Sequence, residues 1–167
     1  MPILDIILIL FLLICAITDL IKHKVYNVVT FPAITAGLLL NIFLFGLSGL
    51  KTSLLGITAG VLILLPFFLL GGMGAGDVKF MAAVGSIKGW SFMFFGGLYG
   101  AIIALVISVI LMAFRGTLLS SLKKIVNFFL FLFTFKKAVP IDKESTIILP
   151  YCFFLSLGMF IRFFLPN

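Results

Sequence analysis

The chain has 167 residues, of which 63% are hydrophobic and only 10% are charged, and its net charge at pH 7 is +7. Its mean hydropathy of +1.40 excludes an ordinary soluble domain and is typical of a polytopic membrane protein. We therefore expect a single all-α transmembrane domain over residues 1–167 in contact with membrane lipid, and no nucleic-acid partner despite the positive charge.

Six apolar segments predict six transmembrane helices. They cover residues 3–18, 28–45, 52–70, 78–87, 91–114 and 147–165. The fourth and fifth come from one long apolar block, which we divide at Lys88 because a single span needs only about 20 residues. A turn over 46–51 separates the second span from the third, and the fourth is short for a complete crossing.

The positive charges support this division. With the N-terminus outside, nine of the twelve Lys and Arg residues lie on the inner side, as the positive-inside rule requires. Six of them lie between Arg115 and Glu144, where the apolar segment from Ile125 to Phe135 predicts a basic amphipathic helix on the cytoplasmic surface. We expect a multi-pass protein of the cytoplasmic membrane with both termini outside.

Two aspartates lie close to the ends of predicted spans. Asp19 ends the first span, and Asp77 begins the fourth within the glycine-rich stretch from Gly71 to Lys79. A charge at membrane depth costs roughly 3 kcal/mol on insertion scales, so each aspartate is a candidate functional residue. Two complete crossings separate them, and both carboxylates are therefore expected at the cytoplasmic boundary, facing each other. Taken singly, Asp77 is explained as a helix cap and Asp19 as a solvated charge at a helix end.

Paired carboxylates suit the hydrolysis of a peptide bond. Two such groups a few ångströms apart tend to share one proton. The unprotonated member takes a proton from the attacking water, and the protonated member donates to the carbonyl oxygen and later to the leaving amine. This chemistry needs no metal or other cofactor. Cys15, Cys152 and His23 do not have the spacing of a metal site, and we expect both cysteines to be buried free thiols.

The segment Gly74-Ala75-Gly76-Asp77, followed by Lys79, resembles the GxGD motif of the type IV prepilin peptidases. Asp19 with Asn27 downstream is similar to that family's first aspartate and the motif that follows it. The helix count and the basic segment before the last span also fit. The short prepilin peptidases of tight-adherence (Flp-type) pilus systems are most similar.

The last span carries a further point of resemblance. Pro150-Tyr151 at its start resembles another signature of the prepilin peptidases. Phe153 departs from that signature, because the family often has a second proline there.

The resemblance implies an aspartic endopeptidase that cleaves the leader of a prepilin-like, single-span substrate at the cytoplasmic face. Asp19 and Asp77 would be its catalytic pair. The residues implied in substrate binding or in shaping the site are Gly74, Gly76, Lys79, Asn27, Pro150 and Tyr151. Lys79 is equally explained as an interfacial anchor. N-methylation of the product is not expected, because the cysteine-rich domain that accompanies it in longer relatives does not follow the first span.

Two other interpretations use the same aspartates. A presenilin-like intramembrane protease shares GxGD and an aspartate pair, but no Pro-Ala-Leu motif precedes the last span. A small transporter or non-catalytic membrane subunit would use buried aspartates to carry protons or ions. Short spans without an obvious inverted repeat give that interpretation little support.

Overall fold

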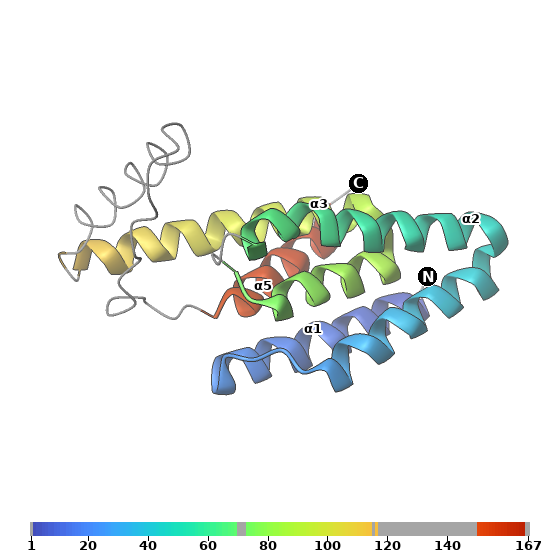
Figure 1. Cartoon of the computed structure of the whole chain (residues 1–167), viewed down its shortest axis with the longest axis horizontal. Helices are drawn as coiled ribbons and strands as arrows, with labels where there is room; N and C mark the ends of the chain where they lie inside the picture. The colour runs from blue at the N-terminus through green and yellow to red at the C-terminus, as the bar shows by residue number, and fades with distance from the viewer. Residues whose placement is uncertain (1, 70–72, 115, 117–149, 166–167) are drawn as a thin grey trace. The chain divides into compact units, whose positions relative to one another are not determined.

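The computed structural model describes residues 2–69, 73–114, 116 and 150–165. These residues form helices and no strand, so the all-α prediction is confirmed for the described part of the chain. The helices are α1 (Pro2–Lys22), α2 (Asn27–Leu69), α3 (Ala75–Phe114) and α5 (Tyr151–Phe164) (Figure 1). The predicted surface helix between Ile125 and Phe135 lies outside the described residues.

Three of these helices, α1, α2 and α3, are long and apolar enough to cross a membrane, whereas α5 is a shorter apolar helix. Large apolar side chains cover their outward faces, among them Phe43, Leu47 and Leu69, each more than 70% exposed. Such surfaces are stable in hydrocarbon, which supports a membrane protein. The count of six crossings remains a prediction.

Each of the two longest helices is interrupted by a glycine with positive φ. Gly46 in α2 has φ 60° and ψ −137°, and Gly89 in α3 has φ 82° and ψ 174°. Residues with a Cβ rarely adopt these angles. Figure 1 shows that the chain reverses direction at both places. The predicted turn over 46–51 is therefore too long, because the helix is interrupted at Gly46 alone. The predicted division at Lys88 falls one residue before the observed break at Gly89.

The helix ends near the site also differ from the predicted spans. The first helix continues to Lys22, so Asp19 lies about one turn inside α1 and the connector is reduced to residues 23–26. The last helix begins at Tyr151 instead of residue 147. Pro150 precedes it as the N-cap, a place that suits a residue without an N–H group.

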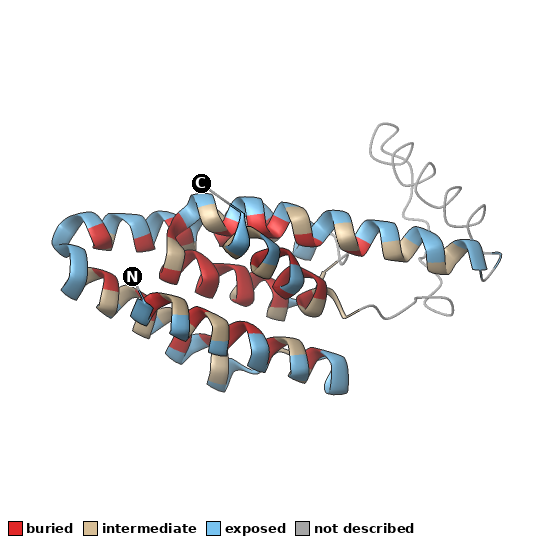
Figure 2. Ribbon diagram, turned by 180° about the vertical axis from the view of Figure 1, so that it is seen from behind, coloured by how far each residue is buried: buried red, intermediate tan, exposed pale blue. Residues whose placement is uncertain are grey.

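The chain divides into two compact units, one of Met1–Ala104 with Pro150–Asn167 and one of Leu105–Leu149. The core of the first unit surrounds the beginning of α3, where nearly every residue from Asp77 to Gly89 is buried (Figure 2). Phe11 of α1 stacks on Phe80 of α3 with ring centroids 5.4 Å apart. On another side, a Cβ on Gly56 of α2 would overlap the carbonyl group of Gly85, so only glycine allows these two backbones to meet.

Polar side chains of α2 satisfy the carbonyl groups that the break at Gly89 exposes. A helix end leaves its last carbonyls without intrahelical partners, and in an apolar environment each one is costly. The buried Asn41 side chain donates to the carbonyl oxygens of Ser86 and Ile87, both at 3.1 Å. Ser53 also donates to the Ser86 oxygen, at 2.7 Å. The break is therefore compatible with a buried, central helix.

Candidate active site

Asp19 belongs to the buried face of α1. The residues of that face recur every three or four positions, which places them on one side of a helix. They are Leu4, Leu8, Phe11, Leu12, Cys15 and Asp19. The Asp19 residue is only 6% exposed. A carboxylate thus stands where the pattern of the helix places an apolar side chain, facing the interior of the bundle.

Asp77 lies at the start of α3 and is 8% exposed. One of its carboxylate oxygens, Oδ2, accepts a hydrogen bond from the Gly74 amide at 3.3 Å. Its own amide donates to the Gly74 carbonyl oxygen at 3.2 Å. Asp77 is the third residue of α3, and its side chain caps the amide of Gly74, the residue just before the helix. The GxGD segment therefore holds the Asp77 side chain in place through its own main chain.

The beginning of α5 holds the other aspartate. The main-chain amide of Phe153 donates to Asp19 Oδ2 at 3.1 Å. Pro150, the N-cap of α5, makes no side-chain capping bond. Asp19 therefore acts as the anionic cap of a helix that follows it far along the chain. The N-terminal end of a helix favours negative charge, so α5 offsets the unfavourable position of Asp19 near the end of α1.

Asp19 and Asp77 lie at the same end of the helices, because Val25 of the connector that follows α1 packs on Gly76, the residue before Asp77. The aspartate pair, as we call these two residues, is formed by α1 and α3, with α5 against Asp19. Cys15, one turn before Asp19, and Cys152, in the first turn of α5, are buried free thiols, as predicted. Among the described residues, no group of three or more His, Cys, Asp or Glu side chains could hold a metal ion.

A second group of predicted site residues gathers beside the aspartate pair. Lys79 Nζ donates to Asn27 Oδ1 at 2.8 Å and lies 5.6 Å from the centre of the Phe31 ring. The connector packs on the GxGD segment, since a Cβ on Gly76 would lie only 3.0 Å from the Cβ of Val25. Gly76 thus lets the connector approach the residue next to Asp77. We call Asn27 and Lys79 the polar bridge.

All eight predicted site residues fall within the described part of the chain. Gly74 and Gly76 contact the aspartate and the connector, Pro150 caps α5, and Tyr151 begins that helix half-buried. Sequence reasoning missed the Phe153 amide and the packing of Val25 on Gly76. Every residue except proline has a main-chain amide, so the sequence gives no sign of the Phe153 contact. The only sign of the packing was Gly76 itself, and the sequence does not show which segment approaches it.

The model of the type IV leader peptidase family matches residues 6–114. The chain belongs to this family. None of the curated proteins and none of the solved structures compared with the chain matches it. The matched region contains both residues of the aspartate pair and the whole GxGD segment, whereas α5 lies beyond it.

Membership in the leader peptidase family decides between the general interpretations. Its members are aspartic-type peptidases, and this supports protease activity for the chain. It also supports a role on prepilin-like substrates in general, and favours that role over an ion or proton carrier. Two buried carboxylates that approach from separate helices are the groups that an aspartic peptidase needs.

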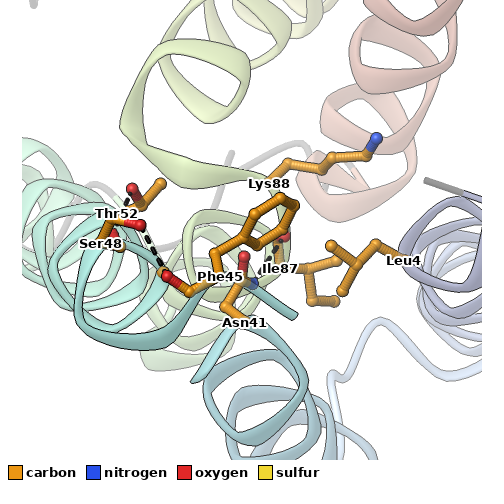
Figure 3. A pocket seen from close by; sticks show the side chains of 8 residues that line it. Leu4, Asn41, Phe45, Ser48, Thr52, Ile87 and Lys88 are labelled. Atoms are coloured by element: carbon orange, nitrogen blue, oxygen red, sulfur yellow. Dashed lines mark hydrogen bonds between the residues drawn. The ribbon is translucent and has the colours of Figure 1, made fainter. Parts of the chain in front are cut away.

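A cavity of about 330 Å³ lies elsewhere in the first unit (Figure 3). It is lined by Leu4, Asn41, Phe45, Ser48, Gly49, Thr52, Ile87 and Lys88. Nearby, Lys88 forms an ion pair with Asp5, near the start of α1. Leu4 and Asp19 are about 22 Å apart along the helix at 1.5 Å per residue. The cavity is therefore separate from the candidate active site of the leader peptidase.

Proposed function

We propose that the chain is a membrane-embedded aspartic endopeptidase that removes the leader of a prepilin-like protein at the cytoplasmic face, with Asp19 and Asp77 as its catalytic pair. One observation carries the proposal: two carboxylates from α1 and α3 are each less than a tenth exposed, and the connector that follows α1 packs on the glycine next to Asp77. Each acid also caps a helix, but an uncharged capping side chain would serve that structural use without the cost of burying a carboxylate.

In this function, one carboxylate of the aspartate pair removes a proton from water as the water attacks the scissile carbonyl carbon. The other carboxyl group donates its proton to the carbonyl oxygen. In the next step the first carboxyl group, which now holds the proton from water, donates it to the amine that leaves, and the second takes a proton back from a hydroxyl group of the tetrahedral intermediate. The resulting proton balance returns the pair to its starting state. Capping through Oδ2 fixes each side chain, and the second oxygen of each carboxylate takes part in proton transfer.

The remaining predicted residues shape the site around this chemistry. Gly76 admits the connector beside Asp77, and the polar bridge of Asn27 and Lys79 joins the start of α2 to α3. Pro150 and Tyr151 set the start of α5, whose first turn meets Asp19. We propose that the substrate leader passes over this surface before its apolar helix enters the membrane.

We also propose six crossings, with the aspartate pair on the cytoplasmic side and both termini outside. The breaks at Gly46 and Gly89 support this count, because each divides one long helix into two segments that run in opposite directions (Figure 1). The positive-inside rule supports the orientation.

The product should be a pilin with a free, unmethylated N-terminus, as for a peptidase of the tight-adherence type. The connector between α1 and α2 has only residues 23–26, which leaves no room there for the domain that accompanies methylation in longer relatives. Mass spectrometry of the cleaved pilin tests this proposal. A methyl group added by this protein alone would contradict it.

The decisive experiment is cleavage of a purified model prepilin by the full chain in detergent, with a metal chelator and without nucleotide. Asp19→Asn and Asp77→Asn should each lower kcat by about 10³-fold or more, because an amide neither accepts nor donates the required proton. Asp5→Asn is the matched control, since Asp5 lies near the other end of α1 and pairs with Lys88. Near-normal turnover by either active-site variant would exclude the proposed pair.

A further inference from the structure

The connector, residues 23–26, is a non-helical stretch between α1 and α2 (Figure 1). At one end the His23 amide donates to the Asp19 carbonyl oxygen at 2.8 Å. At the other end the Tyr26 carbonyl oxygen accepts two amides of the first turn of α2, at 3.0 and 3.1 Å. Between these ends, the main-chain amide and carbonyl groups of Val25 have no hydrogen-bond partner among the described residues. Val25 therefore presents one donor and one acceptor that the fold leaves open.

Val25 is also held in place beside Asp77. Its Cβ lies 3.0 Å from the position that a Cβ on Gly76 would take, and its amide nitrogen lies 3.6 Å from the same position. Side chain and main chain thus both lie against the GxGD segment. The polar bridge holds the start of α2, which follows the connector, on α3. A segment fixed in this way has little conformational freedom left to lose when another chain binds it.

The substrate of the proposed function has open main-chain groups of its own. Its leader junction precedes an apolar helix, and the first four amides of a helix have no intrahelical partner. Such groups are costly at a membrane boundary unless they are paired. Within a helix, the carbonyl oxygen of a peptide bond already accepts an amide of the next turn. The scissile peptide must therefore lie outside the helix when the aspartate pair protonates it.

We propose that Val25 binds the leader junction by strand pairing. The Val25 amide donates to a carbonyl oxygen of the substrate, and the Val25 carbonyl oxygen accepts from a substrate amide. The proposal rests on the proposed function, because it places the scissile peptide beside Asp77. Side chains stand roughly perpendicular to the hydrogen bonds of a strand, so the Val25 side chain stays on Gly76 while the main chain binds.

This mode of binding makes recognition depend on the main chain of the substrate. Strand addition takes its affinity from main-chain hydrogen bonds and its specificity from the pockets around alternate side chains. Neighbouring residues of a strand direct their amide and carbonyl groups to opposite sides. The substrate that pairs with Val25 therefore lies on the side away from the amides of Lys24 and Tyr26. The pairing sets the place along the leader where the aspartate pair acts.

An ester in place of the Val25 amide tests the proposal, because it removes the donor and keeps the side chain on Gly76. The same replacement at Tyr26 is the matched control, since that amide points to the opposite side of a strand. With the full chain in detergent and the model prepilin as substrate, the Val25 ester should raise KM about fivefold with kcat within twofold of wild type. The Tyr26 ester should keep both values within twofold.

A second measurement leaves the protein unchanged. A series of model prepilins has a single ester at successive residues around the scissile bond, with the scissile amide itself kept. One ester, in place of the amide that donates to the Val25 carbonyl oxygen, should raise KM about fivefold with the wild-type protein. Esters at the two flanking residues should keep KM within twofold.

The outcomes separate this proposal from the proposed function. A wild-type KM in the Val25 ester would show that its amide does not bind substrate, and equal rises in the Val25 and Tyr26 esters would show a disturbed connector. If the Val25 ester lacks a cooperative thermal unfolding transition in detergent, the substrate series decides, and a wild-type KM for every substrate ester overturns the proposal. An active wild type with inactive Asp19→Asn leaves the proposed function standing in each case. An inactive wild type would refute the proposed function itself.

Discussion

Each residue of the aspartate pair is stabilised by a main-chain amide, and the nearest lysine is engaged elsewhere. Within the described part of the chain, the Lys79 amine bonds Asn27 and lies over the Phe31 ring. A lysine paired directly with Asp77 would hold that carboxylate in its charged form. Amides that donate to one oxygen leave the second oxygen of each carboxylate available for a proton. This distinction matters for the proposed function, in which the pair exchanges protons with the substrate in each turnover.

The polar bridge gives a prediction at the scale of single residues. Asn27→Ala and Lys79→Met should each lower kcat/KM about fivefold, because one hydrogen bond that positions the start of α2 is lost. The double variant should lose no more than the worse single variant, since both changes remove the same contact. Steady-state cleavage of the model prepilin measures all three values.

Lys51→Met is the control for the loss of one exposed lysine, and it should match wild type. If the losses from Asn27→Ala and Lys79→Met multiply in the double variant, the two residues act separately. The polar bridge would then have no joint role in catalysis.

At the scale of elements, the most demanding feature is the break in α3. The segment before Gly89 is surrounded by other helices, and its last carbonyls end inside the core. Asn41 reaches them from α2, as Figure 3 shows for its contact with the Ile87 main chain. This arrangement lets a short central helix carry Asp77 at its beginning and end within the bundle. The contacts at the break thus hold the end of this short helix that lies opposite Asp77.

Asn41→Leu should destabilise the protein by about 1–3 kcal/mol, because it leaves the buried Ile87 carbonyl without its donor. Thermal unfolding in detergent measures the effect. Thr58→Ala is the control, since Thr58 is exposed and donates to carbonyl groups of the preceding turn of its own helix, Leu54 at 2.9 Å and Leu55 at 3.1 Å. Equal stability of Asn41→Leu and wild type would mean that Asn41 does not support the break.

At the scale of the whole molecule, the sequence predicts that the two aspartates lie on the same side of the membrane. Apolar runs reveal how often a chain crosses, and two crossings between Asp19 and Asp77 return it to the same side. That prediction uses the pattern of side chains alone. The structure adds that Asp19 lies on the buried face of α1, with apolar residues at helical spacing.

What the sequence could not predict depends on main-chain groups and on contacts between distant segments. The partner of Asp19 is an amide of α5, and amides are the same in every sequence. The C-terminal end of α1 disfavours the negative charge of Asp19, and only the packed structure shows that the start of a second helix lies beside it. The Asp5–Lys88 pair was missed for a similar reason. Its members lie in different spans, and no local pattern links them.

The last prediction concerns how the molecule is placed in the membrane. Ser91 is exposed just after the break in α3, and Ser120 lies in the basic segment outside the described residues. Under six crossings with the aspartate pair on the inner side, Ser91→Cys should react with an impermeant thiol reagent in intact cells. Ser120→Cys should react only after the inner face is opened. The native thiols give a low background, because Cys15 and Cys152 are 1% and 0% exposed.

The two labelling sites separate the possible errors. The reverse pattern, with Ser120→Cys labelled from outside and Ser91→Cys protected, would mean that the orientation is inverted and that the aspartate pair lies on the outer side. Labelling of both from outside would mean that no membrane crossing lies between them. In that case residues 91–114 would not span, and the basic segment would not be cytoplasmic. The aspartate pair would still lie on the inner side, because labelling of Ser91→Cys from outside is the result expected for the proposed crossings before residue 91.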